Sequence, residues 1–180
     1  MPLPAPADTA RPDLTDKIVM VTGASGGLGE PIARACAAAG ATVVLHGRVV
    51  RKLEALYDAL VASGAPEPVI LPLDLAKAEA SDFANIAMAL ETQFGRLDAL
   101  VHTAVQLGSL GPIEHQSFDR WLGVLRVDLA APMGLTRALV PLLAASADAS
   151  VTFTLDTRGE DPRAYWGSYA AAKAGLSALA

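Results

Sequence analysis

The sequence predicts a doubly wound α/β fold, in which helices cover both faces of one parallel sheet. Short apolar runs rich in β-branched residues alternate along the chain with segments whose apolar residues recur at helical spacing. The strand-like runs lack a clean apolar–polar alternation, as expected for strands that are buried on both faces. Strands separated by helices pair in parallel through right-handed crossovers, which gives a three-layer α/β/α sandwich.

Each element is expected where its own pattern begins and ends. The predicted strands cover residues 17–22, 42–46, 69–73, 97–101 and 150–155. The predicted helices cover residues 28–39, 53–60, 83–94 and 117–145, and a last helix starts near Ser168. Pro72 cannot donate a hydrogen bond to a sheet and so limits the third strand. Gly95 is expected to end the third helix, and Pro132 is expected to kink or break the long one.

Length and composition fit one domain. The chain has 180 residues and a net charge of −5 without a Lys/Arg cluster, which argues against a nucleic-acid or anionic-membrane surface. Cys36 is the only cysteine, so no internal disulfide forms, which fits a cytoplasmic protein. No apolar run approaches the ~20 residues that a membrane helix needs.

The two ends of the chain give separate expectations. Residues 1–15 contain several prolines and are expected to be a disordered leader, and residues 16–180 form the single domain. The sequence stops inside a helical pattern, whereas a full domain of this class would continue with at least one more strand. The chain therefore looks like a fragment, a truncated form or the ordered part of a longer chain.

A glycine-rich turn joins the first strand to the first helix. Residues 22–29 read T-G-A-S-G-G-L-G, and glycines let the backbone turn tightly and approach a ligand. The helix that follows offers free N–H groups and a partial positive charge to a pyrophosphate. We therefore predict a Rossmann-type dinucleotide site, against the alternative of a purely structural turn. The expected cofactor contacts are Gly23, Ser25, Gly26, Gly27, Leu28 and Gly29.

The end of the second strand indicates which nicotinamide cofactor binds. NAD-binding domains place an acid there, whereas this strand ends in His46-Gly47-Arg48. No carboxylate repels a 2′-phosphate, and Arg48 can form a charge-assisted pair with one. The sequence therefore favours NADP over NAD. The alternative is that Arg48 is a solvated residue in the first turn of the next helix.

Tyr169 and Lys173 form a candidate catalytic pair. A spacing of four places both side chains on one face of a helix. A nearby ammonium stabilises the phenolate and is expected to lower the pKa of the tyrosine from its usual ~10. The tyrosine could then exchange a proton with a carbonyl or alcohol oxygen. The alternative is an exposed Tyr/Lys pair without function.

Together, the glycine turn and the Tyr-x-x-x-Lys pair resemble the short-chain dehydrogenase/reductase family from about residue 17 to residue 180. The resemblance implies hydride transfer between nicotinamide and a carbonyl or secondary-alcohol substrate. It also implies that Lys173 binds the nicotinamide ribose, that Asp74 and Leu75 lie at the adenine, and that Ala104 lies beside the cofactor. Asp74 could instead cap the helix that follows. A homodimer or homotetramer is implied, with the long and last helices at the interface.

Three positions depart from the family pattern. Asp156 stands where the family has a serine that donates a hydrogen bond to the substrate, thirteen residues before Tyr169. An ionised aspartate cannot donate and disfavours a developing alkoxide, although a protonated one could still work. Asp128 replaces the active-site asparagine, and Val105 replaces a glycine beside the cofactor. Thr157, next to Asp156, would point to the other face of a strand.

The histidines do not suggest a metal site. His102 is expected to be a hydrogen-bonded loop residue, and His46, His102 and His115 lack metal-ligand spacing. Three functions remain open. The first is an NADP-dependent oxidoreductase whose activity is in doubt because of Asp156 and Asp128. The second is a degenerate dinucleotide-binding protein with little or no turnover, and the third is an inert fragment.

Overall fold

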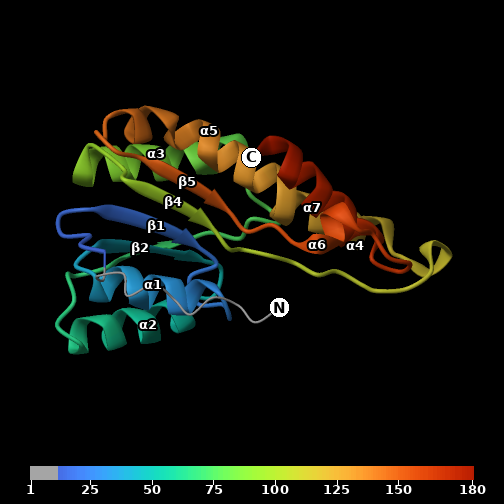
Figure 1. Ribbon diagram of the computed structural model, residues 1–180, viewed down its shortest axis with the longest axis horizontal. Coiled ribbons are helices and arrows are strands. Elements are labelled where there is room, and N and C mark those ends of the chain that lie inside the picture. The colour runs from blue at the N-terminus through green and yellow to red at the C-terminus, as the bar shows by residue number, and fades with distance from the viewer. Residues whose placement is uncertain (1–11) are drawn as a thin grey trace, which may run out of the picture.

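Five parallel strands form a single sheet in the computed structural model, which describes residues 12–180 (Figure 1). Their order in the sheet is β3-β2-β1-β4-β5. The strands are β1 (Ile18–Thr22), β2 (Thr42–Gly47), β3 (Val69–Pro72), β4 (Ala99–His102) and β5 (Ser150–Phe153). The predicted doubly wound fold is confirmed, and the strand ends differ from the prediction by one or two residues.

Helices cover both faces of the sheet (Figure 1). On one side lie α1 (Gly29–Ala38) and α2 (Val50–Ala62). On the other side lie α3 (Ala80–Phe94), α4 (Phe118–Leu125), α5 (Ala131–Ala144) and α7 (Gly167–Leu179). Two short helices were not predicted, η1 (Ile113–His115) and α6 (Thr157–Glu160). The first lies in the connection between β4 and α4, and the second lies in the connection between β5 and α7.

The two faces of the sheet have separate apolar cores. Along β1, Val19 and Val21 pack in the core beneath α1 and α2. Ile18 and Met20 point the other way and pack in a core that includes Leu135 of α5. Successive side chains of a strand point to opposite faces, so both sets of positions must be apolar here. This explains why the strands show no apolar–polar alternation.

The predicted long helix is continuous but changes its pitch. A π-helical turn, η2 (Arg126–Ala130), joins α4 to α5. Pro132 directly follows this turn and lacks the N–H that a continuous α-helix would use for a hydrogen bond. The expected break at Pro132 is therefore a local change of pitch. Such π turns frequently lie at functional sites.

The same continuous helix corrects one expectation from the sequence. By length and composition, Phe118–Ala144 is long and apolar enough to cross a membrane. Its residues Leu135, Leu139 and Leu142 are buried in the core against the sheet and α3. We therefore interpret it as a core helix of the domain.

Most of the predicted leader lies outside the described residues. Of its last four residues, Leu14 donates from its backbone amide to the carbonyl of Ala39 at 2.8 Å. Its side chain also packs against the core beneath α1. Leu14 therefore belongs to the fold rather than to a disordered leader.

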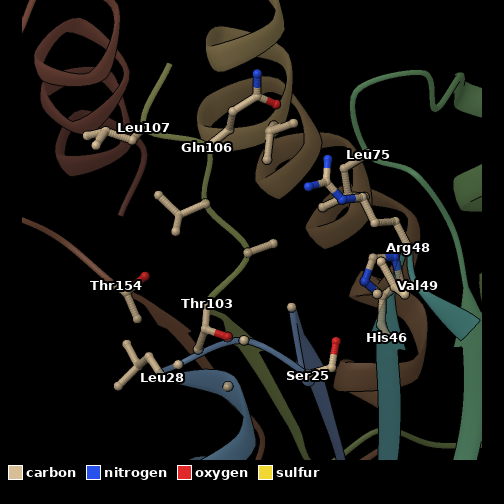
Figure 2. Close-up of a pocket in the computed structure, with 18 of the residues that line it drawn as sticks. Ser25, Leu28, His46, Arg48, Val49, Leu75, Thr103, Gln106, Leu107 and Thr154 are labelled. Carbon is tan, nitrogen blue, oxygen red and sulfur yellow. The ribbon is translucent and has the colours of Figure 1, made fainter. Parts of the chain in front are cut away.

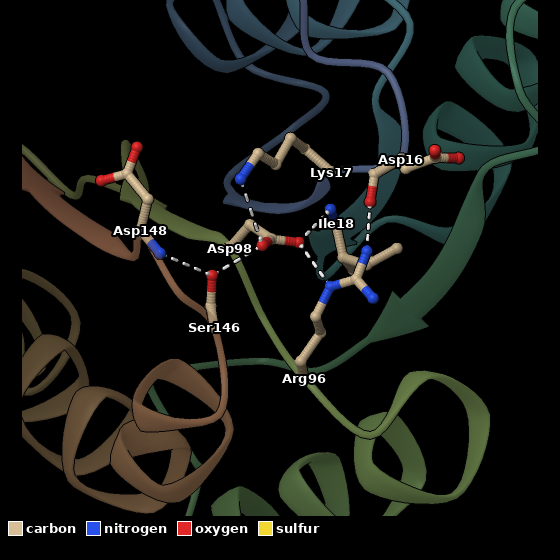
Figure 3. A network of polar contacts seen from close by, with 7 residues as sticks. All are labelled: Asp16, Lys17, Ile18, Arg96, Asp98, Ser146 and Asp148. Atoms are coloured by element: carbon tan, nitrogen blue, oxygen red, sulfur yellow. Dashed lines mark hydrogen bonds and ion pairs between the residues drawn. The ribbon is translucent and has the colours of Figure 1, made fainter.

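A buried carboxylate ties the amino ends of β1 and β4 together (Figure 3). Asp98 accepts hydrogen bonds from the Ser146 hydroxyl at 2.7 Å and the Ile18 amide at 2.8 Å. Arg96 donates to it at 3.2 Å, and the Lys17 ammonium lies 3.7 Å away. Burial raises the pKa of Asp98, but these hydrogen bonds outweigh burial and leave the pKa below its usual value.

Replacing Asp98 with alanine is expected to lower the free energy of unfolding by about 2–3 kcal/mol at neutral pH, because the buried Ile18 amide and Ser146 hydroxyl lose their acceptor. Since the pKa is depressed in the folded state, this contribution is present above the unfolded pKa and disappears as pH falls through the folded pKa. Urea unfolding at several pH values measures it. Asp148→Ala is the control, because only its backbone amide joins the network. Equal losses in both variants would contradict the assignment.

Candidate active site

A cleft of about 690 Å³ opens at the carboxyl ends of the strands. It lies where the strand order reverses between β1 and β4, which is where open α/β sheets bind ligands. In Figure 2, Ser25 and Leu28 lie on one side of this opening and Gln106 and Leu107 on the other. The structure brings most of the predicted site residues together here. Those that line the cleft are Gly23, Ser25, Gly26, Gly27, Leu28, Gly29, Arg48, Asp74, Leu75, Ala104, Asp156, Tyr169 and Lys173.

Two glycines of the turn have no room for a side chain. Gly23 adopts a left-handed φ of 65°, and a Cβ there would lie 2.8 Å from the Cα of Ala104. A Cβ on Gly29 would collide with the carbonyl oxygen of Gly23. The close approach of the turn to the segment after β4 therefore requires glycine at both positions.

The turn leaves backbone amides available at the start of α1. Gly26 donates to the Gly23 carbonyl at 2.9 Å, and Glu30 donates to the Gly26 carbonyl at 3.0 Å. Within residues 12–180, the amides of Gly27 and Leu28 donate to no protein acceptor, and a Cβ on Gly27 would meet nothing within 4 Å. Bare amides beside a helix N-terminus fit the pyrophosphate of a dinucleotide.

Two cationic side chains border the cleft near the end of β2. Arg48, just after β2, is exposed and lines the cleft. Lys52, in the first turn of α2, lines it too. The first residue before α2, Val49, gives its helix no side-chain cap. Lys52 was not predicted, and because Arg48 precedes the helix, the spacing of the two residues in the sequence gave no signal for it. Together these groups suit a phosphate ester on the ribose.

Asp74 shapes the turn after β3. Its Oδ1 accepts a hydrogen bond from the Ala76 amide at 3.2 Å. Helix α3 begins later, at Ala80, and is capped instead by Glu79 together with Asp82. The alternative that Asp74 caps the following helix is therefore wrong.

Two buried histidines, His46 and His102, lie on β2 and β4, the strands on either side of β1. The Nε2 atom of His102 lies 2.9 Å from the hydroxyl oxygen of Thr136, and the His102 ring stacks on the ring of Phe153. The expectation of a hydrogen-bonded histidine is confirmed, although His102 ends β4 rather than lying in a loop. His46 is 1% exposed and has no hydrogen-bond partner within the described residues. Burial lowers the pKa of each ring to about 4, so both are neutral at physiological pH.

Asp156 is hydrogen-bonded directly to the candidate catalytic tyrosine. Its Oδ2 accepts from the Tyr169 hydroxyl at 2.9 Å, and its Oδ1 accepts from the Arg158 amide at 2.8 Å. These hydrogen bonds hold the pKa of Asp156 below its usual value. The carboxyl group is therefore ionised at neutral pH, and the alternative of a protonated Asp156 is wrong. Strand β5 has already ended, and Thr157 starts α6, so the expected strand alternation does not apply to it.

The environment of Tyr169 is the reverse of the one predicted from its spacing to Lys173. Burial raises the pKa of Tyr169 well above its usual range, and the hydrogen bond to Asp156 and the charges of Asp156 and Asp128 add to the effect. The Lys173 ammonium donates to the Thr154 carbonyl at 2.8 Å and lies 5.7 Å from the centre of the tyrosine ring. Burial lowers the pKa of Lys173, and the two carboxylates oppose this shift. Tyr169 therefore keeps its proton at neutral pH.

Asp128 lies behind the cleft, in the π turn η2, and does not line it. Its Oδ1 accepts from the Gln106 amide at 2.7 Å, which fixes the segment after β4. Its Oδ2 has no partner within the described residues, and the residue is 1% exposed. Burial raises the pKa of Asp128 to about 6, so it carries at least part of a negative charge at neutral pH. Val105, in the same segment, is exposed and lines the cleft.

The chain is similar to proteins of one family over nearly its whole length. Residues 17–180 match the short chain dehydrogenase family. The uncharacterized oxidoreductase YciK of Escherichia coli strain K12 is 37% identical over 160 residues, which are 89% of this chain and 64% of YciK. The chain spans roughly half to two thirds of the length of the curated relatives that it matches first.

Solved structures give the same result. The structure of yciK from E. coli superposes with a TM-score of 0.93 at 34% identity, over 97% of this chain and 72% of that one. A protein of E. coli CFT073, described as a short chain dehydrogenase complexed with NADPH, superposes with a TM-score of 0.91 at 35% identity. That match covers 95% of this chain and 71% of the other.

Proposed function

Because the chain belongs to the short-chain dehydrogenase family, we propose that it acts as an NADP-dependent oxidoreductase in the cleft described above. The observation that carries the proposal is that the bare amides of the glycine turn and the Tyr169–Lys173 pair border one cavity. When bound, the nicotinamide supplies or accepts a hydride. The amides of Gly27 and Leu28 would hold the pyrophosphate, and Tyr169 would face the reacting group of a small molecule.

Several features support NADP rather than NAD. Arg48 and Lys52 both border the cleft, and no carboxylate follows β2 to repel a phosphate. A relative of 35% identity was crystallised with NADPH. Asp74 and Leu75 would lie at the adenine and Ala104 beside the cofactor, as the family pattern implies.

Arg48→Glu is expected to weaken NADPH binding about tenfold and to leave NADH binding within about twofold, because only NADPH carries the 2′-phosphate that the guanidinium would pair with. Fluorescence titration with each cofactor measures both constants. Arg51→Glu is the matched control, since Arg51 lies three residues further along in the first turn of α2, is exposed and does not line the cleft. An equal loss of affinity for NADPH and NADH would show that Arg48 does not bind the 2′-phosphate.

A second candidate function is dinucleotide binding with little turnover of carbonyl compounds. The Asp156–Tyr169 hydrogen bond favours it, because an ionised carboxylate cannot donate to a carbonyl oxygen and disfavours an alkoxide. Asp156→Ser is expected to raise turnover of ketones and aldehydes by about tenfold or more. The serine hydroxyl can donate a hydrogen bond to the substrate oxygen, and the substitution removes one negative charge from the site. NADPH consumption over a panel of carbonyl compounds measures it. Unchanged turnover would contradict the assignment of Asp156 as the block.

We propose a cytoplasmic location and a homodimer or homotetramer for the protein. Exposed apolar side chains on the long helix support an interface there, namely Phe118, Met133 and Val140. The direct test of the proposed function is NADPH binding followed by a turnover screen on carbonyl, alcohol and imine compounds. Binding with hydride transfer supports the oxidoreductase. Failure to bind either nicotinamide cofactor would contradict both candidate functions.

A further inference from the structure

We propose that this cleft is built for substrates whose reacting group is a carbon–nitrogen double bond protonated on nitrogen, with Asp156 as the counter-ion of that N–H group. The inference rests on the proposed NADP-dependent function and names the substrate class of the same site. The geometry that carries it is an ionised carboxylate, hydrogen-bonded to Tyr169, at the place where substrate and tyrosine would meet.

The carboxylate of Asp156 has acceptor capacity left for a substrate. Each of its oxygens accepts one hydrogen bond, from Tyr169 and from the Arg158 amide. A carboxylate offers about four lone-pair sites, so two remain. Asp156 is only half-buried and lines the cleft, so a donor in the cleft can reach it. The Tyr169 hydroxyl beside it already donates its single proton to Asp156, so a group that only accepts, such as a carbonyl oxygen, must compete with the carboxylate for that proton.

The charges around the tyrosine hydroxyl favour a cation. Burial is the largest cause of the raised pKa of Tyr169, and the negative charges of Asp156 and Asp128 raise it further. The Lys173 ammonium lies 5.7 Å from the centre of the tyrosine ring, but it donates its hydrogen bond to the Thr154 carbonyl. Arg158 approaches Asp156 with its backbone amide, while its guanidinium lies 5.3 Å over the ring of Trp166. The charges of Arg158 and Lys173 also act on Asp156 and help to lower its pKa. Within the described residues neither side chain donates to that carboxylate, so the reacting group meets the free lone pairs of a negatively charged Asp156.

The two substrate classes respond to this negative site in opposite ways. Hydride addition to a carbonyl creates negative charge on oxygen next to a carboxylate, which raises the barrier. A protonated carbon–nitrogen double bond arrives as a cation, and the ion pair with Asp156 stabilises its protonated, reactive form. The same residue that impairs a carbonyl reductase thus activates an imine.

The reaction balances with the cofactor of the proposed function as reductant. A neutral imine takes up one proton from solvent on nitrogen. Its carbon takes up one hydride from NADPH, and the π pair becomes the nitrogen lone pair. The products are a neutral amine and NADP⁺. Tyr169 keeps its proton throughout and positions Asp156 through their 2.9 Å hydrogen bond.

A binding experiment tests the charge preference without turnover. Calorimetry on the full chain saturated with NADP⁺ compares benzamidine, a protonated amidine, with benzamide, its neutral analogue of the same shape. We expect benzamidine to bind at least tenfold more tightly, and we expect Asp156→Asn to bring the two affinities within about twofold. Asp161→Asn, which changes an exposed aspartate outside the cleft, should leave the preference intact. Equal affinities in the wild type, or a preference that survives Asp156→Asn, would overturn the inference.

A turnover experiment separates this inference from the proposed function. NADPH consumption is followed with matched pairs of imines and ketones, including pyrroline and cyclopentanone. We expect kcat/KM to be at least tenfold higher for the imine in the wild type, and we expect Asp156→Ser to reverse the order. A wild type that prefers ketones overturns the inference and leaves the oxidoreductase standing. A protein that neither binds NADPH nor consumes it with any substrate overturns the proposed function, on which the inference rests.

Discussion

Gly29→Ala is expected to weaken NADPH binding at least about 100-fold, which corresponds to about 2.7 kcal/mol. A Cβ at this position would collide with the Gly23 carbonyl oxygen and come within 2.7 Å of the Thr103 hydroxyl. The start of α1 must then move away from the strand that precedes the turn. The proposed pyrophosphate site consists of the Gly27 and Leu28 amides, which are held in place by the close approach of Gly29 to Gly23. A displacement of α1 therefore turns these amides away from one common point. Titration with NADPH measures the affinity, and thermal unfolding of the same sample measures the fold.

A second pair of variants separates binding from folding. Leu28 is 53% exposed in the cleft, so a polar residue there costs the fold little. Leu28→Asp places a carboxylate at the proposed pyrophosphate and should weaken NADPH binding at least tenfold, whereas the neutral and equally sized Leu28→Asn should retain most of it. Equal affinities in these two variants would place the dinucleotide elsewhere.

Tyr169→Phe is expected to lower kcat about 100-fold on whichever substrate class the wild type reduces. The change removes one hydroxyl, which donates to Asp156 at 2.9 Å and borders the reacting group. Loss of one positioned proton-transfer or hydrogen-bonding group typically costs 10²–10⁴-fold in rate. We expect the lower end of this range, because burial and Asp156 raise the pKa of Tyr169 and make it a weak acid. NADPH affinity should change less than about threefold.

The control for this variant is Tyr165→Phe, since Tyr165 is 59% exposed and does not line the cleft. It should leave kcat within about twofold of the wild type. If Tyr169→Phe retained wild-type kcat while binding NADPH normally, the reacting group would not lie at the tyrosine. The cleft would then still bind the cofactor, but the proposed catalytic role of Tyr169 would be contradicted.

The fold was predictable because its signals are local. Val19, Met20 and Val21 form an unbroken apolar run, which only a strand covered on both faces requires. Gly95 ends α3 with a left-handed φ of 68°, which is a common role of glycine after a helix. The pitch change at η2 was not predictable, because Pro132 marks a disturbance without saying which form it takes.

The site was predictable in its membership and not in its electrostatics. Residues at the carboxyl ends of parallel strands meet at one edge of a sheet, so the glycine turn, Arg48 and Tyr169 could be placed together from their positions in the sequence. The spacing of Tyr169 and Lys173 gave the wrong sign for the tyrosine pKa. That sign depends on burial and on the Asp156 hydrogen bond, which are tertiary contacts. Lys173 makes its own hydrogen bond to Thr154, whose backbone role leaves no trace in the sequence.

The central claim is that the bare amides of the glycine turn hold a dinucleotide whose reactive end reaches Tyr169. An amide NMR titration of the full chain with NADP⁺ tests it most directly. We predict that the resonances of Gly27 and Leu28 shift together with those of Ala104 and Tyr169, along one saturable curve. Saturable binding that leaves the Gly27 and Leu28 amides unshifted would contradict the claim.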